Sequence, residues 1–405
     1  MVSTSALKSP VRMVGALAIT QTIGYGVLYY AFSVFITPMS RDLHAGVAQI
    51  TGAITLSLLV AASVAPLVGH WLDRHGGRRL MTAGSVLGAA AVLAWSQVTD
   101  VLQLYAVCAL LGVGSAMVLY EAAFAVIVAW FESMRRARAL LAVTVVAGFA
   151  SSIFLPLTGF LVDRYGWRTA LVVLACAYAL VTVPLHALTV RDRPVPAPPA
   201  GGRRRIVGDA LRAWPFWLLT TAFLAQTAAV AVMGVLLVTY LITLGHSPVF
   251  AATAAGLLGV LSVTGRLVTT GLQARMRISL ITATVFVLQG TAALLLPLIG
   301  RDAAGAIAAV VLFGLGFGVS TIARPALVAD RYGTAAFATL TGAMTLPIKV
   351  GHALAPLLAA ALAQAAGYPA VMSAVAGCCL VGALSLLAYD RRGRTDGTAP
   401  PRHVR

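Results

Sequence analysis

Long apolar runs recur along nearly the whole chain, and short polar stretches rich in glycine, proline and charged residues separate them. A helix needs roughly 20 apolar residues to cross a hydrocarbon core about 30 Å thick, and the runs are long enough for this. The pattern predicts an all-α integral membrane protein with twelve transmembrane helices in two six-helix halves. The predicted spans are residues 13–37, 47–71, 79–97, 101–130, 138–162, 168–189, 215–243, 248–272, 278–299, 303–329, 335–364 and 369–389.

A polar segment separates the two sets of six spans. It holds four prolines between residues 194 and 199, followed by arginines at 203–205. Proline interrupts helices and arginine is costly in lipid, so this segment is predicted to be a cytoplasmic linker. The predicted divisions are an N-terminal half at 1–190, the linker at 191–213, a C-terminal half at 214–390 and a cytoplasmic tail at 391–405.

The composition agrees with a membrane protein, because 60% of the residues are hydrophobic and only 10% are charged. A soluble domain would carry roughly a quarter charged residues. The four cysteines lie in apolar spans and lack the spacing of a metal site, and no cofactor is expected. The spans offer no His or Asp pair at catalytic spacing, which argues against an enzyme.

The positive charge is distributed in a way that predicts orientation. With both termini inside, the inner connections and tails hold 22 of the 29 Lys and Arg residues, and the outer loops hold only Arg41, Arg164, Arg168 and Arg301. Connections rich in these residues stay in the cytoplasm. The same distribution explains the net charge of +17 without a nucleic-acid partner.

Two polar connections contain an internal repeat with an offset of ninety residues. Gly, Asp, Arg, Gly and Arg occur with the same spacing after the second and the fifth span. The first set is Gly69, Asp73, Arg74, Gly76 and Arg78, and the second is Gly159, Asp163, Arg164, Gly166 and Arg168. The offset covers three helices and reverses the side of the membrane, as expected of inverted three-helix repeats.

The loop from Gly69 to Arg79 resembles the signature loop of the major facilitator superfamily, and this resemblance covers nearly the whole chain. It implies a major facilitator fold in which Asp and Arg brace neighbouring helix ends. A gating or structural role is expected for the first repeat set and for Asp163 and Arg164 of the second. In the second half, the equivalent loop from Gly271 to Arg275 has no Asp, so a weaker brace is expected there.

Four ionisable residues stand out at depth in the spans, where charge is costly and commonly functional: Glu121, Arg266, Arg324 and Lys349. Ser262, Thr269 and Thr270 share a helical stripe with Arg266, and His352 lies one turn from Lys349. Such stripes line water or substrate. Snorkelling to the headgroups fits poorly for Lys349 and stays open for Arg266, and Arg324 has either a structural or a functional role.

An arginine in the eighth span and a lysine in the eleventh look like the anion-binding pair of the oxalate:formate antiporter group, which is allied to the monocarboxylate transporters. The aromatic first span from Tyr25 to Phe35 is also similar to theirs. The resemblance implies a carboxylate site at Arg266 and Lys349. Three first-span residues are expected to face it: Gln21, Tyr25 and Tyr29. The chain departs from the animal monocarboxylate transporters at Ser262, where they carry an Asp.

These observations predict a secondary transporter that moves a small organic anion, a mono- or dicarboxylate, by alternating access. Glu121 is either a proton site or an internal ion pair, and His352 either tunes the site or is a hydrogen-bonding neighbour. The expected partners are this anion, a coupled proton or counter-anion, and the lipid bilayer, around a monomer. The alternative is a drug or other small-molecule exporter of the same fold. Abundant alanine and an excess of arginine over lysine suggest a bacterial inner membrane.

Overall fold

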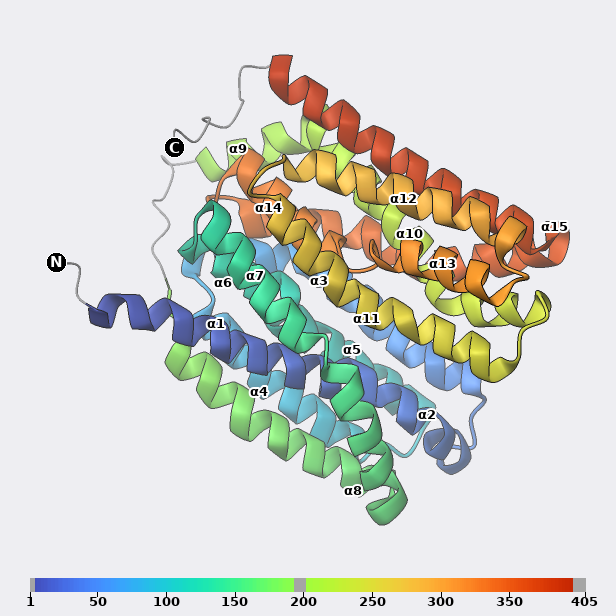
Figure 1. The fold of residues 1–405 in the computed structure, drawn as a ribbon. Coiled ribbons are helices and arrows are strands. Elements are labelled where there is room, and N and C mark those ends of the chain that lie inside the picture. Colours follow the sequence, from blue (N-terminus) through green and yellow to red (C-terminus); the bar gives the residue numbers. More distant parts are fainter. Residues whose placement is uncertain (1–3, 193–201, 396–405) are drawn as a thin grey trace. The chain divides into compact units, whose positions relative to one another are not determined.

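The structure is a computed structural model that describes residues 4–192 and 202–395, and its regular secondary structure in those residues is helical (Figure 1). The helices are α1 Thr4–Tyr25, α2 Ala31–Asp42, α3 Val47–His75, α4 Arg78–Trp95, α5 Val101–Val118, α6 Tyr120–Trp130, α7 Ser133–Ala147, α8 Ala150–Thr189, α9 Gly202–Arg212, α10 Trp214–Thr243, α11 Pro248–Leu272, α12 Ile278–Ile299, α13 Ala303–Gly314, α14 Ser320–Tyr332 and α15 Phe337–Thr395. A π-helical turn, η1 Gly26–Tyr30, joins α1 to α2.

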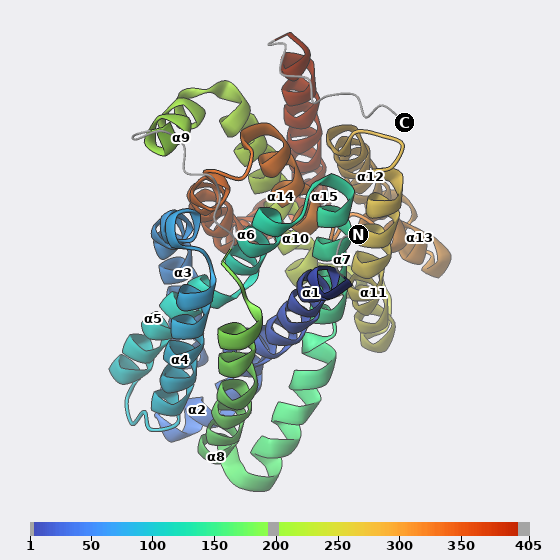
Figure 2. The same cartoon turned by 90° about the vertical axis from the view of Figure 1, so that its left-hand side faces the viewer.

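The helices form twelve transmembrane spans. Eight helical stretches are long and apolar enough to cross a membrane. Two of them, Met134–Thr189 in α7 and α8 and Phe337–Arg391 in α15, contain two spans each, because a bend at Gly166 or Gly367 divides them. Figures 1 and 2 show the two arms of α8 meeting at that bend. The remaining spans are α4 and the pair α13 and α14.

The chain divides into two compact units. Unit 1 comprises Met1–Arg203 together with Tyr332–Leu346, and unit 2 comprises Arg204–Arg331 together with Pro347–Arg405. Helix α15 contributes to both units, since its first residues belong to unit 1. Helix α9 lies in the predicted linker and was not expected to be helical. Residues 193–201 of that linker and residues 396–405 of the predicted tail lie outside the described residues.

Glycines at the bends share the same backbone dihedral angles, so the internal repeat is present in the structure as well as in the sequence. Gly76 (φ 78°, ψ −177°) and Gly166 (φ 76°, ψ 163°) are ninety residues apart and share one conformation. Gly367 has nearly the same angles (φ 81°, ψ 169°) between the eleventh and twelfth spans. A positive φ of this kind favours glycine, which has no Cβ to clash with the backbone. The connection after the eighth span, at 273–277, has no glycine, so its sequence departs from the other three repeats.

Two arginines of the repeat make reciprocal contacts in unit 1. Nε of Arg78, at the start of the third span, donates to the carbonyl oxygen of Ala187 near the end of the sixth (2.7 Å). A terminal nitrogen of Arg168, at the start of the sixth span, donates to the carbonyl oxygen of Val98 just after the third (2.9 Å). The same interaction therefore occurs once at each end of the third and sixth spans, as an inverted repeat requires.

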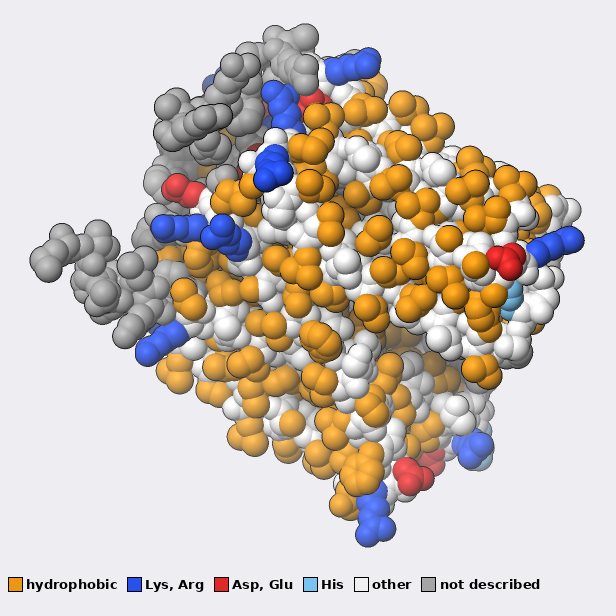
Figure 3. Space-filling view, viewed as in Figure 1, with side chains coloured by type: hydrophobic (Ala, Val, Ile, Leu, Met, Phe, Trp, Pro, Cys, Tyr) orange, Lys and Arg blue, Asp and Glu red, His pale blue; other side chains and the backbone are white. Residues whose placement is uncertain are grey.

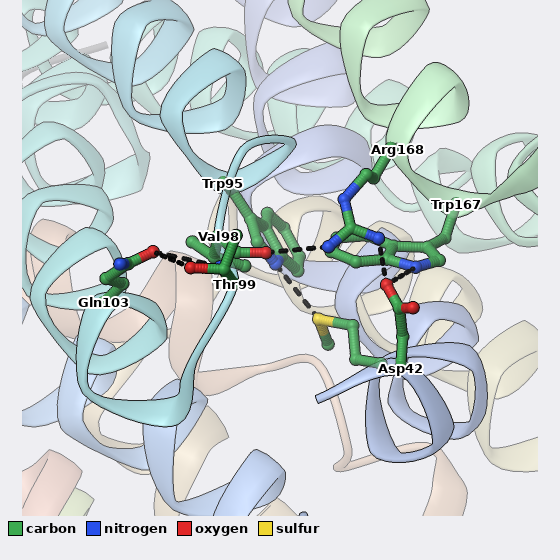
Figure 4. Close-up of polar contacts among 8 residues, drawn as sticks. Asp42, Trp95, Val98, Thr99, Gln103, Trp167 and Arg168 are labelled. Atoms are coloured by element: carbon green, nitrogen blue, oxygen red, sulfur yellow. Dashed lines mark hydrogen bonds and ion pairs between the residues drawn. The ribbon is translucent and has the colours of Figure 1, made fainter. Parts of the chain in front are cut away.

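The contact at Arg168 belongs to a larger group, the clasp, formed by Asp42, Val98, Trp167 and Arg168 (Figure 4). Arg168 forms an ion pair with Asp42, and Nε1 of Trp167 donates to the same carboxylate oxygen (3.2 Å). The guanidinium carbon lies 4.2 Å from the centre of the Trp167 ring. The clasp joins the ends of the first and third spans to the start of the sixth.

Replacing Arg168 with alanine is expected to lower the free energy of unfolding by about 1 kcal/mol. The ion pair alone contributes little because both side chains are roughly two-fifths exposed, whereas the carbonyl bond and the ring contact add to it. Thermal unfolding of the purified protein measures the change. Arg164→Ala is the matched control, since Arg164 is exposed and has no recorded contact within the described residues. Equal melting temperatures for the two variants would contradict a stabilising clasp.

Hydrophobic side chains cover the middle of the helices on the face drawn in Figure 3, and the charged side chains in view lie near helix ends. Leu102, Leu180 and Leu298 are each more than 70% exposed. In water such side chains would favour aggregation, whereas in a bilayer they contact lipid. Each unit also has its own buried core, with Trp95 and Tyr178 among the fully buried residues of unit 1 and Phe313 in unit 2.

Candidate functional site

The first span changes helix type where its aromatic residues begin. At η1 the helix widens to a π-turn, a feature frequent at functional sites. Gly26 opens this turn, and a Cβ there would overlap the ring of Phe154. The ring of Tyr25 lies 4.5 Å from that of Tyr120 and 6.5 Å from that of Tyr29. The structure thus gathers two predicted site residues, Tyr25 and Tyr29, into one aromatic cluster in unit 1.

The fourth span is broken at Leu119, where ψ is −165°. Helix α5 ends at Val118, and α6 begins at Tyr120 with Glu121 in its first turn. The positive end of a helix dipole stabilises a carboxylate at this position. Glu121 is partly buried and lies near Tyr25, so the break brings this predicted residue to the aromatic cluster.

Gln21 contacts the same break from α1. Its side chain is fully buried, and its amide nitrogen donates to the carbonyl oxygen of Val118 (2.7 Å). Its amide oxygen is buried and has no hydrogen-bond partner among the described residues. Gln21 is therefore bonded to the backbone of the fourth span within unit 1.

In unit 2, Arg266 lies on α11 opposite an irregular stretch of the tenth span. Residues 315–319 form turns between α13 and α14, and Nε of Arg266 donates to the carbonyl oxygen of Gly318 (3.3 Å). A Cβ on Gly265 would overlap the carbonyl of Leu315, so the two segments approach closely. Arg266 is 9% exposed.

The predicted stripe beside Arg266 is largely buried within unit 2. Ser262, Thr269 and Thr270 are each less than 9% exposed, and the Thr270 hydroxyl donates to the Arg266 carbonyl (2.9 Å). The buried face is polar, as expected for residues near a charge in a membrane.

Lys349 and His352 lie near each other on α15, just beyond Pro347. Both are partly buried, and His352 lies against the backbone of Thr227 on α10. A Cβ on Gly351 would overlap the side chain of Leu224, which shows how closely α15 passes α10. In the described part of unit 2, no carboxylate lies within ion-pair distance of Lys349. Arg266 and Lys349 both belong to unit 2, while Gln21, Tyr25, Tyr29 and Glu121 belong to unit 1.

Asp73 binds the N-terminus of α15 within unit 1. Its carboxylate accepts hydrogen bonds from the backbone nitrogens of Ala338 (3.0 Å) and Thr339 (2.8 Å), and from the Thr339 hydroxyl (2.6 Å). Cβ atoms on Gly69 and Gly342 would overlap the backbone of the opposite helix, so glycine permits the close approach of α3 and α15. The carboxylate replaces the acceptors that the first turn of a helix lacks.

Residues 72–77 of this loop line a cavity of about 310 Å³ in unit 1, whose lining includes Arg74, Gly76, Trp130, Arg191 and Phe337. Arg74 is exposed there.

Arg78 contacts the segment that follows the sixth span: its backbone nitrogen donates to Oδ1 of Asp192 (2.9 Å).

Asp163 and Arg164 are exposed near the Gly166 bend. Arg324 is partly buried in α14, immediately before Pro325.

The second half retains an ion pair at the loop that lacks the Asp. Arg277 lies 3.3 Å from Oδ1 of Asp390, and the Ser279 hydroxyl donates to the same oxygen (2.9 Å). These residues join the start of the ninth span to the end of the twelfth, as Arg78 and Asp192 do for the third and sixth. This pair was not predicted from the sequence.

A buried amide cluster in unit 2 was also missed. The amide nitrogen of Gln226 approaches Oε1 of Gln289 and the Gly316 carbonyl oxygen (3.5 Å each), and the Ser320 hydroxyl donates to Oε1 of Gln226. Nε2 of Gln289 donates to the Phe313 carbonyl (3.2 Å). Glutamine in the middle of an apolar span was the available signal, since a buried polar group needs a partner.

Comparison with protein families gives one match over most of the chain: the model of the Major Facilitator Superfamily matches residues 17–355. An MFS-type transporter of Gibberella moniliformis is 29% identical over 345 residues, which are 80% of this chain and 78% of that protein. Among solved structures, the fucose:proton symporter of E. coli has a TM-score of 0.76 at 14% identity, covering 94% of this chain and 99% of that one.

Two relatives are carriers of named substrates. Monocarboxylate transporter 13 of Bos taurus is 27% identical over 242 residues (60% of this chain, 56% of that protein). The oxalate:formate antiporter of Oxalobacter formigenes is 27% identical over 241 residues (57% and 54%). The chain thus matches just over half the length of each of these two carriers.

Proposed function

Because the chain belongs to the major facilitator superfamily of multi-pass membrane transporters, we propose that it is a secondary active transporter of a small organic anion, a mono- or dicarboxylate. The observation that carries the proposal is the charge within the spans of unit 2. Arg266 and Lys349 are cations at membrane depth, and the spans of the second half contain no deep Asp or Glu. Similarity to a monocarboxylate transporter and an oxalate:formate antiporter supports the same substrate class.

The two cations suit different parts of a carboxylate. The planar guanidinium of Arg266 matches two oxygens, and the ammonium of Lys349 supplies a compact charge from another helix. Tyr25 and Tyr29 would complete the site from the first half, with Glu121 as the candidate proton site. Neutralising the cations by the anion would lower the cost of closing the two halves around it, which is the basis of alternating access.

The gate proposed for this cycle is the contact between Asp73 and the first turn of α15. Its three hydrogen bonds join the second span to the eleventh and must break for these helices to separate. The halves that move are 1–190 and 214–390, joined by the linker at 191–213, with both termini in the cytoplasm as the positive charge predicts.

A thermal-shift screen of the detergent-purified protein against formate, oxalate, lactate and succinate tests the substrate class. A carboxylate at a hundred times its dissociation constant is expected to stabilise the protein by about 2.7 kcal/mol. Lys349→Ala should lose this response, whereas Arg301→Ala, at an exposed arginine near a helix end, should keep it. If amphiphilic cations stabilise the protein and none of the carboxylates does, the proposal is overturned in favour of an exporter.

A further inference from the structure

Each half of the chain contains an interruption in its fourth span, after which a new helix begins. The backbone nitrogens of Ala122 and Ala123 both donate to the Leu119 carbonyl (3.0 and 3.1 Å). In unit 2, those of Ile322 and Ala323 both donate to the Val319 carbonyl (3.1 and 2.9 Å). Leu119 and Val319 are 200 residues apart, so the two interruptions occupy equivalent places in the two halves.

An interruption of this kind leaves backbone groups without their helical partners. In a continuous helix the nitrogen of Ala122 would donate to Val118, but here it donates to Leu119 and the Val118 carbonyl loses its donor. Inside a membrane an unsatisfied carbonyl costs several kcal/mol. The break is therefore stable only if another group donates to it.

A buried glutamine of the first span of each half approaches a carbonyl of the break. In unit 1, Gln21 donates to Val118 (2.7 Å). In unit 2, Gln226 approaches Gly316 (3.5 Å), whose carbonyl also accepts from the Val319 nitrogen (3.3 Å). Both side chains are at most 1% exposed. An amide suits this task because it donates strongly, carries no charge and can be buried at lower cost than lysine or arginine.

The two breaks hold the candidate site residues. In unit 1, the break precedes Glu121 and places the Tyr120 ring 4.5 Å from Tyr25. In unit 2, the broken segment supplies the Gly318 carbonyl to which Arg266 donates. The shape of each break thus sets where these side chains lie.

We propose that Gln21 and Gln226 are positioning residues, each holding the break in the fourth span of its half and thereby placing Glu121 and Arg266. Their effect on transport rests on the proposed function, but their effect on the breaks does not. Gln21 lies 2.7 Å from the Val118 carbonyl oxygen, whereas Gln226 lies 3.5 Å from a carbonyl oxygen that also accepts from a backbone nitrogen, so loss of Gln21 should have the larger local effect.

Hydrogen–deuterium exchange of the full-length protein tests this. Gln21→Leu should speed exchange at Ala122 and Ala123 by roughly five- to tenfold, the effect of losing one hydrogen bond, and Gln226→Leu should speed it less at Ile322 and Ala323. Thr22→Val and Thr220→Val are matched controls. Each removes a buried hydroxyl from the same span that bonds only within its own helix, to Ala18 or Phe216.

If Gln21→Leu does not fold, Gln21→Asn, whose amide is one methylene too short to reach Val118, replaces it. Unchanged exchange at Ala122 and Ala123 in a folded Gln21 variant, or an equal increase in Thr22→Val, would overturn the proposal. Oxalate serves as the binding probe in a second arm, where Gln21→Leu should weaken binding and Thr22→Val should not. If the wild-type protein does not bind oxalate, that result counts against the proposed carboxylate transport alone. The proposal for Gln21 and Gln226 is still tested by hydrogen exchange, which is measured without a ligand.

Discussion

Replacing Arg266 with alanine is expected to raise the dissociation constant for the stabilising carboxylate by roughly ten- to a hundredfold, because a hydrogen bond to a charged group contributes about 1.5–3 kcal/mol. Arg266 is 9% exposed, so its interaction with an anion would be weakly screened by water. Isothermal titration calorimetry with the carboxylate identified by thermal shift measures the dissociation constant of each variant.

Two further variants separate charge from geometry at this position. Arg266→Lys keeps the charge but loses the planar fork and the Nε bond to Gly318, so intermediate binding is expected. Arg275→Ala removes an exposed arginine beyond the end of the same helix and should bind as the wild type does. Unchanged affinity in Arg266→Ala would make this buried cation a structural partner of the tenth span and not an anion ligand.

The spans could be predicted closely because membrane thickness and apolar length are both encoded locally. The seventh, eighth and ninth spans were predicted at 215–243, 248–272 and 278–299, and the helices run 214–243, 248–272 and 278–299. Residues at their ends explain this agreement: Pro248 can begin a helix but not continue one, and the Arg277 charge stays out of the lipid.

The interruptions within spans were not predicted, because their causes lie far away in the chain. Residues 115–123 contain no proline or glycine to mark the break at Leu119, and the donor that satisfies it, Gln21, is 97 residues away from Val118. The tenth span did carry a local signal in Gly314, Gly316 and Gly318, which was not used. The π-turn at η1 likewise packs against a distant residue, since its Gly26 lies against the ring of Phe154 in the fifth span.

The site residues could be recognised in the sequence by their residue type, but their contacts could not be predicted. A charge in an apolar span identifies Arg266 and Lys349 at once, since lipid penalises both wherever they point. The sequence gives no means of pairing Arg266 with the Gly318 carbonyl, or Asp73 with the nitrogens of Ala338 and Thr339, because these contacts depend on the tertiary arrangement. The resemblance implied a helix-end partner for Asp73 without saying which helix.

Replacing Asp73 with alanine is expected to speed hydrogen–deuterium exchange at Ala338 and Thr339 by about ten- to a hundredfold. The carboxylate accepts three hydrogen bonds at the first turn of α15, and leaving buried donors unsatisfied costs about 1–3 kcal/mol. Asp73→Asn keeps one acceptor oxygen and should show a smaller increase. Asp209→Ala, which removes an exposed carboxylate paired with Arg205 within α9, should leave both amides unchanged.

The outcome decides whether this contact controls the eleventh span. If Asp73 holds the segment 332–346 on unit 1, its loss should loosen that segment as a whole, so exchange should rise along the first turns of α15 and not only at the two bonded amides. Exchange confined to Ala338 and Thr339 would indicate that the glycine contacts at Gly69 and Gly342 suffice to hold the helices together. The proposed gate would then reside in the packing of α3 on α15, with the carboxylate serving only as a helix cap.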